Sequence, residues 1–279
     1  MRYPCHQLLC IGALLALGAV TSPARADNTE LPAWQTLEFE QRALWATAKS
    51  RIELVAAPQH PGQWLLSANS SVVSNSEEVQ LRLLAESGQL VSRSRLSRGK
   101  NQRLKTYDYH PQYILRERRA PGTDPQQAAA LWPLQSSKEV AYPDALGAKV
   151  LTDAYALLLI AQRFSETQTN SRQVAVHTDL NFYQVTLSLG QDTAIEVNYQ
   201  LAGNGQVEGT RNARVIKLKV AALGQARDKA DFRLLGLNGD IELLVEIESG
   251  LLLQLRGTAP RIGSSRISLK SATLRESTR

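Results

Sequence analysis

The stretch Ile241-Glu-Leu-Leu-Val-Glu-Ile-Glu-Ser-Gly-Leu-Leu-Leu-Gln-Leu-Arg256 decides the fold class of this chain. Apolar side chains at 241, 243, 245 and 247 alternate with positions 242, 244, 246 and 248, three of which are glutamates. This period of two predicts a strand with one buried face and one carboxylate-bearing face in water. Ser249-Gly250 then predicts a two-residue turn into a second strand over Leu251–Arg256, because such turns need residues that tolerate positive φ. The stretch therefore predicts an antiparallel hairpin.

The same alternation recurs along the chain after Trp34, most clearly at residues 37–40, 79–83, 183–189 and 215–220. Further tight turns are predicted at Ser87-Gly88, Asn204-Gly205 and Asn238-Gly239, so neighbouring strands are expected to run antiparallel. No fixed-period repeat is evident, which argues against solenoids and propellers. These patterns predict a mainly β protein.

One apolar segment breaks the alternation. Within Leu151–Phe164, the residues Ala154, Leu157, Leu158, Ala161 and Phe164 recur at three- and four-residue intervals, which predicts a helix over Thr152–Phe164. Thr152 or Asp153 is expected to cap its start by accepting a backbone hydrogen bond. Because Leu159 and Ile160 widen the apolar stripe, the helix should be buried on most sides. We interpret it as a core helix; the alternative is that Leu157, Leu158 and Phe164 shape a ligand site.

Before this helix, a proline- and glycine-bearing stretch covers residues 120–147, with a short helical tendency at Gln126–Leu131. Its composition predicts a crossover between two β halves, serving as a lid or a surface strap. We therefore expect a single β-rich domain over 27–279, with halves 27–119 and 171–279 joined by a crossover and helix at 120–170.

Residues 1–26 have the features of a cleaved export signal. Arg2 gives a basic start, Leu8–Val20 is an apolar run, and Ala24-Arg25-Ala26 matches a signal-peptidase site. The run is shorter than the roughly 20 residues that a membrane-spanning helix needs. We predict cleavage after Ala26 and a mature protein in the periplasm, with secretion as the alternative, and at most a peripheral membrane association.

Composition narrows the chemistry of the mature chain. Both cysteines, Cys5 and Cys10, lie in the predicted leader, so the mature chain is expected to have no disulfide, thiolate nucleophile or cysteine metal site. Of 32 basic side chains, the leader removes Arg2 and Arg25 and leaves 30 against 26 acidic ones. An exported protein with this mild excess should not meet nucleic acid. The expected partners are a lipid, a glycolipid or another envelope protein.

The densest charge feature is the segment from Arg93 to Arg119, which holds nine basic and two acidic side chains with three interleaved tyrosines. Such interleaving can hold an anionic partner. Alternation of Arg93 and Arg95 with serines instead favours a solvated strand face. Both interpretations stay open, and the candidate binding residues are Arg93, Arg95, Lys100, Arg103, Lys105, Tyr107 and Tyr109.

Catalytic patterns are weak. The mature histidines His60, His110 and His177 lie in no metal or triad motif, and His177-Thr178-Asp179 has a base and a carboxylate at a spacing common by chance. Nucleophile-elbow, zinc-helix and phosphate-loop motifs are absent from the sequence. A glycan hydrolase would need only two carboxylates, and Glu38, Glu40, Glu242, Glu246 and Glu248 are candidates, although their alternation is typical of outward strand charges. We therefore predict no enzyme, metal site or cofactor.

The order of these elements, with the helix Thr152–Phe164 between β halves and the ending Leu251–Gly257 and Pro260–Gly263, resembles a large family of exported bacterial proteins: the domain of unknown function numbered thirty-one hundred and eight. The likeness runs over Leu37–Leu274 and departs at Ala43–Ala48 and at the helix start. It implies a curved antiparallel sheet with a helix against its concave side, and more loosely resembles the half-barrels that carry lipids or lipoproteins across the periplasm.

We therefore expect a curved antiparallel sheet, an open or half barrel with one buried α-helix. The predicted function is non-enzymatic binding or carriage of an amphipathic or anionic envelope component. The alternatives are a glycan hydrolase that uses two carboxylates, and an assembly factor that docks on an envelope protein by strand addition. For strand addition, the terminal strand Ile267–Leu274 is the expected edge.

Overall fold

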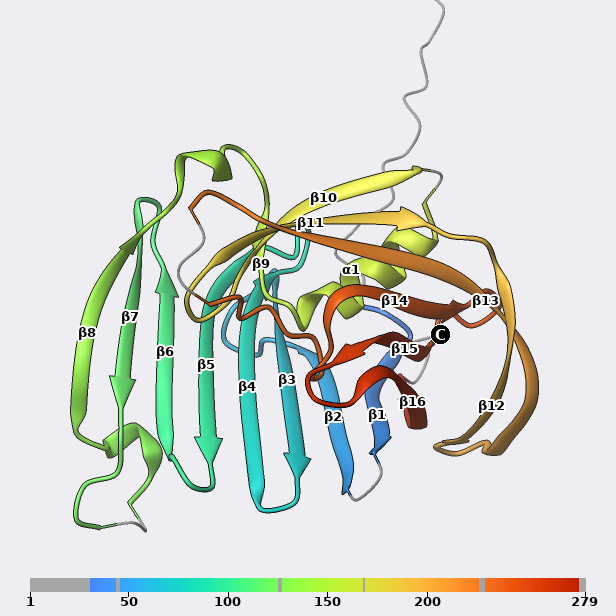
Figure 1. Ribbon diagram of the computed structural model, residues 1–279, viewed down its shortest axis with the longest axis horizontal. Coiled ribbons are helices and arrows are strands. Elements are labelled where there is room, and N and C mark those ends of the chain that lie inside the picture. Colours follow the sequence, from blue (N-terminus) through green and yellow to red (C-terminus); the bar gives the residue numbers. More distant parts are fainter. Residues whose placement is uncertain (1–30, 44–45, 125–126, 168, 226–228, 276–279) are drawn as a thin grey trace, which may run out of the picture.

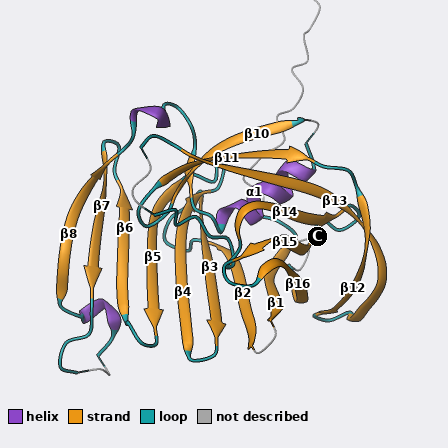
Figure 2. Cartoon of the chain, in the orientation of Figure 1, coloured by secondary structure: helices purple, strands orange, loops and turns teal. Residues whose placement is uncertain are grey.

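The computed structural model describes residues 31–275, apart from 44–45, 125–126, 168 and 226–228. The described residues form one curved sheet of sixteen strands and one α-helix (Figures 1 and 2). The path of paired strands stays open, so the predicted mainly β class, with an open or half-barrel sheet, is confirmed. The predicted leader, residues 1–26, lies outside the described residues.

The N-terminal strands form a simple antiparallel meander in which each strand pairs with the next. Their bounds are β1 (Trp34–Ala43), β2 (Ala46–Ala56), β3 (Gln63–Val72), β4 (Asn75–Leu84), β5 (Leu90–Arg98), β6 (Arg103–Tyr109), β7 (Tyr113–Arg119) and β8 (Leu134–Ala141). Short 3₁₀ helices, η1 (Ala129–Leu131) and η2 (Asp144–Leu146), flank β8.

The remaining elements return across the concave side of this meander (Figure 1). They are β9 (Leu151–Thr152), α1 (Ala156–Ser165), β10 (Ser171–His177), β11 (Phe182–Leu189), β12 (Thr193–Leu201), β13 (Gly205–Ala222), β14 (Asn238–Glu246), β15 (Leu252–Ala259) and β16 (Gly263–Leu274). β16 pairs with β1 and joins the two arms. β12 pairs with β13 and, over two residues, with β16, so this end of the sheet rolls over on itself.

The helix α1 fills the hollow between the two arms. Leu157, Leu158 and Phe164 are at most 1% exposed and share one core cluster with side chains from both arms, including Leu66 and Val185. The indole of Trp34 on β1 donates a hydrogen bond to the amide of Gln162 (2.5 Å). Buried apolar area is the main stabilising term in such a core, so the expectation of a buried helix is confirmed.

The helix nevertheless begins four residues later than predicted. Leu151 and Thr152 pair in parallel with Ala175 and Val176 of β10, and the Thr152 hydroxyl donates to the carbonyl of Gly88 (2.8 Å). Asp153 accepts the backbone N–H of Tyr155 (2.9 Å) in the turn before the helix, whose own start has no side-chain cap. Sheet pairing therefore outweighs helical periodicity at Leu151–Thr152.

The hairpin of the opening sequence exists, but two of its details were wrong. β14 ends at Glu246 and the turn covers residues 247–251, since Gly250 donates to the carbonyl of Glu246 and Glu246 donates to that of Leu251. Glu246 is 5% exposed rather than outward, and it pairs with Arg211 (3.2 Å) and Ser249. The consecutive residues 243–246 are all buried, so both faces of β14 are covered at this end, and Tyr199 of β12 lies near the Glu246 carboxylate.

Three further expectations need correction. Asn238-Gly239 opens β14, and the tight turn lies just before it, at Leu234–Leu237. The predicted crossover contains a full strand, β8, which forms one edge of the sheet and is exposed on most of its length, so it has no apolar alternation to detect. The terminal strand β16 is internal rather than an edge, because β1 and β15 flank it. No helix among the described residues has the length and apolarity to cross a bilayer.

Candidate functional site

An open cleft of about 820 Å³ lies on the face of the sheet that also carries α1. Residues of β2 to β5 form one wall. The facing wall comes from the turn at 153–155, the β10–β11 turn at 177–179 and the loops at 231–236 and 259–262. The cleft thus lies between the meander and the loops of the returning arm, which are far apart in the sequence.

Cationic side chains line both walls of the cleft. Arg95, Arg98, Lys100 and Arg103 come from β5, β6 and their turn, while Arg233 and Arg261 face them from the returning arm. Arg95 pairs with Glu77 (2.5 Å) and Arg98 with Glu78 (3.4 Å). Among the ion pairs of the described residues, none involves Lys100, Arg103, Arg233 or Arg261. These four cations leave the cleft with unneutralised positive charge.

Uncharged side chains complete the lining. Ser50 and Ser70 on neighbouring strands share a hydrogen bond (2.9 Å), and the Tyr155 hydroxyl also bonds with Ser70. Burial raises the pKa of Tyr155, so this phenol stays neutral at physiological pH. Apolar side chains at the mouth include Val72, 39% exposed, and Ile262, 54% exposed. The cleft therefore offers cations, hydroxyls and apolar surface to one ligand.

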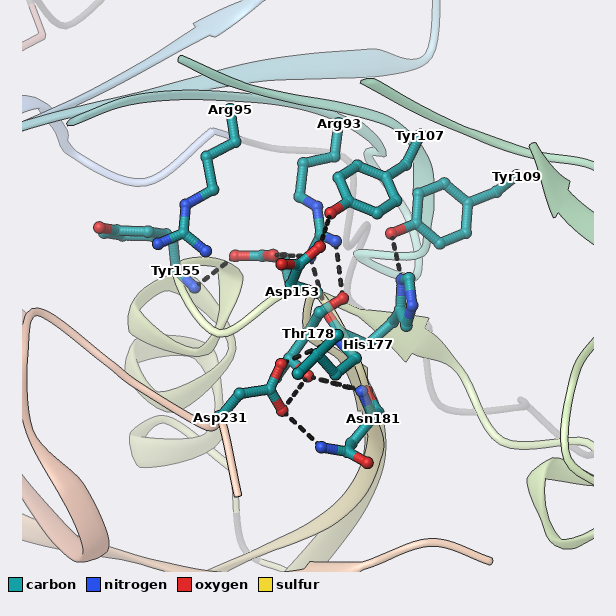
Figure 3. A network of polar contacts seen from close by, with 12 residues as sticks. Arg93, Arg95, Tyr107, Tyr109, Asp153, Tyr155, His177, Thr178, Asn181 and Asp231 are labelled. Atoms are coloured by element: carbon teal, nitrogen blue, oxygen red, sulfur yellow. Dashed lines mark hydrogen bonds and ion pairs between the residues drawn. The ribbon is translucent and has the colours of Figure 1, made fainter. Parts of the chain in front are cut away.

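At the inner end of the cleft, Arg93 joins three segments of the chain (Figure 3). Its guanidinium donates to the carboxylate of Asp153 (2.9 Å) and to the backbone carbonyls of His177 and Thr178 (2.7 Å each). The guanidinium also lies 3.9 Å from the ring centre of Tyr107, which is cation–π geometry. Arg93 therefore clamps β5 to the start of the helix and to the β10–β11 turn.

The charge of Arg93 is stable in this position. Burial alone would lower the pKa of Arg93, but the neighbouring tyrosines and the Asp153 carboxylate outweigh it and hold that pKa above its ordinary value. The Arg93 side chain is 5% exposed and that of Asp153 is 8% exposed, so the pair is withdrawn from solvent screening. These contacts make Arg93 a structural clamp.

A second, partly buried cluster surrounds Asp179, two residues beyond His177. Its carboxylate accepts hydrogen bonds from Lys105, Tyr107 and Arg116, the last at 2.8 Å. Burial would raise the pKa of Asp179, but the bonds from Lys105 and Tyr107 and the nearby cations hold that pKa well below its usual value. Burial lowers the pKa of Lys105, and Asp179 counters part of that change. With three donors on it, Asp179 stays ionised.

Asp231 ties the β10–β11 turn to the connection between β13 and β14. Its carboxylate accepts hydrogen bonds from the Thr178 hydroxyl (2.7 Å), the Leu180 backbone N–H (2.8 Å) and the Asn181 amide (2.8 Å) (Figure 3). On the other side of the turn, the Tyr109 hydroxyl hydrogen-bonds with Nδ1 of His177 (2.9 Å). His177 and Asp179 of the suspected base–carboxylate pair thus both serve the turn's architecture.

The predicted candidate residues divide into three groups. Arg93, Arg95, Lys100 and Arg103 line the cleft. Lys105, Tyr107 and Tyr109 lie behind it, in the clamp and the Asp179 cluster. Leu157, Leu158 and Phe164 belong to the hydrophobic core cluster rather than to the cleft lining. The prediction of a solvated face was wrong for Arg93 and Lys105, which are each 6% exposed.

Several site residues had no signal in the sequence. Asp231, Arg233 and Arg261 lie in loops without periodicity, and only the fold brings them to β5. The sequence predicts Asp153 as a helix cap and gives no sign of its ion pair with Arg93, which lies sixty positions earlier. The closeness of His177 and Asp179 in the sequence indicates this turn, but the contacts of both residues hold the turn in place and form no catalytic pair.

The four carboxylates that line the cleft among the described residues all have hydrogen-bond or ion-pair partners. Glu77, Asp153 and Asp179 pair with arginine or lysine, and Asp231 accepts several neutral donors. Within the described part of the chain, no group of three or more histidine, cysteine or acidic residues is arranged to hold a metal ion. Comparison of this chain with models of known families, with curated proteins and with solved structures gives no match. The resemblance to the exported family stays a prediction.

Proposed function

We propose that the cleft binds an amphipathic, anionic component of the bacterial envelope, such as a lipid, a lipoprotein or a glycolipid, and carries it in the periplasm without chemical conversion. The observation that supports this most is that one open cavity combines exposed apolar side chains with four cations that form no ion pair among the described residues. Its volume of about 820 Å³ is in the range of small-molecule sites.

A monomeric lysophospholipid provides a direct test. We expect the purified protein to bind lysophosphatidylglycerol below its micellar concentration, measured by isothermal titration calorimetry. The double variant Arg233→Gln/Arg261→Gln should bind about tenfold more weakly, which corresponds to ~1.4 kcal/mol. The same variant should bind the uncharged detergent dodecyl maltoside about as well as the unaltered protein does, because this ligand has no anionic group for the two arginines to contact.

The matched control is Lys217→Gln/Lys219→Gln. These lysines are exposed on β13, outside the cleft, and their loss changes the net charge by the same amount. If both double variants weaken lysophosphatidylglycerol binding equally, the effect comes from the net charge of the protein and not from the cleft. Absence of lysophosphatidylglycerol binding by the unaltered protein would reject the proposal.

The two alternatives have weaker support. A glycan hydrolase needs a carboxylic acid whose pKa is raised so that it can donate a proton, whereas the pKa of Asp179 is lowered and the other cleft carboxylates are occupied by donors. Strand addition would use the free edge β8, which carries Lys138 and Glu139, charges that discourage such pairing. Release of reducing ends from purified peptidoglycan would favour the hydrolase.

A further inference from the structure

One end of the meander gathers the connections between six strands, β3 to β8, into a continuous rim. The antiparallel register pairs Val72 with Asn75, Ser76 with Arg98, Ser97 with Arg103, Leu104 with Arg119 and Arg119 with Leu134. The turn at 72–75, the turn at 99–102 and residues 129–134 therefore lie at the same end, the lower side of the sheet in Figure 1. We call these three segments the rim.

The first two segments of the rim are in direct contact. Gly99 has φ +115°, and a side chain there would meet the amide oxygen of Asn75 at 2.2 Å. The third segment follows next to them, since η1 contacts β6 and Leu134 begins β8.

Exposed apolar side chains are concentrated on the rim. Val73 is 75% exposed, Leu131 67%, Leu134 48% and Val72 39%. These are four of the eight large apolar side chains that are exposed in the described part of the chain. They form two groups, one at each end of the rim.

Val73 also occupies a strained backbone position. It is the first residue of the two-residue turn between β3 and β4, and its φ is +54°. A β-branched residue is a genuine outlier in this region, where glycine or asparagine is the ordinary choice. The chain thus keeps an exposed valine where a polar residue would fit the backbone better, and such retained strain is typical of functional positions.

The space between the two apolar groups is basic. Lys100 and Arg118 are exposed and Arg103 is half-buried, and none of the three takes part in an ion pair among the described residues. Arg98 and Arg119 are neutralised by Glu78 and Glu117. Asp124 is the remaining described acid of the β7–β8 connection. The rim therefore keeps a net positive charge between its apolar ends.

We infer that the rim docks the protein on the surface of an anionic lipid bilayer. The apolar tips would enter the interface between headgroups and acyl chains, while Lys100, Arg103 and Arg118 meet lipid phosphates; this combination binds membrane surfaces without spanning them. Val72, Lys100 and Arg103 also line the cleft, so docking places the cleft mouth on the bilayer. The inference concerns a second surface and stands even if the cleft takes a different ligand.

Vesicle cosedimentation of the purified protein tests this inference. We expect binding to vesicles of 70% phosphatidylcholine and 30% phosphatidylglycerol, and much weaker binding to pure phosphatidylcholine. The variant Val73→Asn/Leu131→Ser should lower the partition coefficient at least about tenfold, because each apolar side chain loses most of its burial in the interface. Its melting temperature should be unchanged or higher, since asparagine relieves the strain at residue 73.

The matched control is Leu84→Ser/Ile247→Ser, which removes two exposed apolar side chains away from the rim, 37% and 47% exposed. It should bind vesicles like the unaltered protein. Lys100→Gln/Arg118→Gln should weaken binding to anionic vesicles only. Undiminished binding by the rim variant, an equal loss in the control, or no binding of the unaltered protein to anionic vesicles would overturn the inference.

Discussion

Replacing Arg93 by methionine tests whether the clamp holds the two arms of the sheet together. Methionine has a similar length but removes the charge and all three hydrogen bonds to Asp153, His177 and Thr178. Asp153, only 8% exposed, then becomes an unpaired buried carboxylate. Breaking a buried pair in this way costs about 3–5 kcal/mol, a large part of a typical stability of 5–15 kcal/mol.

For a chain of this size, such a loss lowers the melting temperature by roughly 6–20 °C. Urea unfolding followed by tryptophan fluorescence would measure it, since Trp34, Trp64 and Trp132 are buried reporters. Arg95→Met is the matched control: it lies on the same strand, but its pair with Glu77 is partly solvated, with side chains 40% and 26% exposed. That pair should contribute at most about 1 kcal/mol.

A double variant separates the clamp from general damage to β5. Arg93→Met/Asp153→Leu also removes the stranded carboxylate, so it should cost clearly less than the sum of the two single substitutions. If the losses in free energy of unfolding add in the double variant, or if Arg93→Met and Arg95→Met lose the same amount, then Arg93 does not act through a desolvated pair.

Three other substitutions probe the core, the Asp179 cluster and the β14–β15 turn. Leu158→Asp should prevent folding, because a buried carboxylate without a partner costs several kcal/mol, whereas Leu180→Asp at a partly exposed position should fold; circular dichroism distinguishes them. Asp179→Asn should lose about 2–4 kcal/mol at neutral pH. Since the folded pKa of Asp179 lies below its unfolded value, its contribution is full above about pH 4 and fades as the pH falls further, so the variant should show a flatter stability profile in acid. Gly250→Ala should cost about 1 kcal/mol or more in urea unfolding, because φ there is +69° and the new Cβ meets Gln162 at 3.3 Å.

The general architecture could be predicted because burial of one sheet face leaves a period of two in the sequence. Strands such as β11 and β13 follow that rule, and the helical spacing around Leu157 identifies the buried helix. β8 could not be found in this way, since an edge strand exposed on most of its length has no apolar face. At Glu246 the rule failed for the opposite reason: both faces of β14 are covered there.

Only one wall of the cleft could be predicted from the sequence. A basic run on β5 and β6 is visible in the sequence, but the facing wall comes from loops at 153–155, 177–179, 231–236 and 259–262, which no local pattern connects. Alternation with serine made Arg93 resemble a solvated side chain. Its burial depends on partners 60 to 85 positions away, which are brought close only by the return of the chain across the sheet.

This long-range pairing divides the basic segment into two roles. Arg93 pairs with the buried Asp153 and Lys105 with the partly buried Asp179, and both pairs contribute to the stability of the folded chain. Lys100 lies in the turn between β5 and β6, and Arg103 is the first residue of β6. Neither has an ion-pair partner among the described residues, and both lie at the cleft and the rim. A folded chain gains little by collecting unpaired cations beside exposed valine and leucine, because like charges repel and apolar surface in water is unfavourable. An anionic amphipathic partner would offset both costs, which is why we assign recognition to the second group and stability to the first.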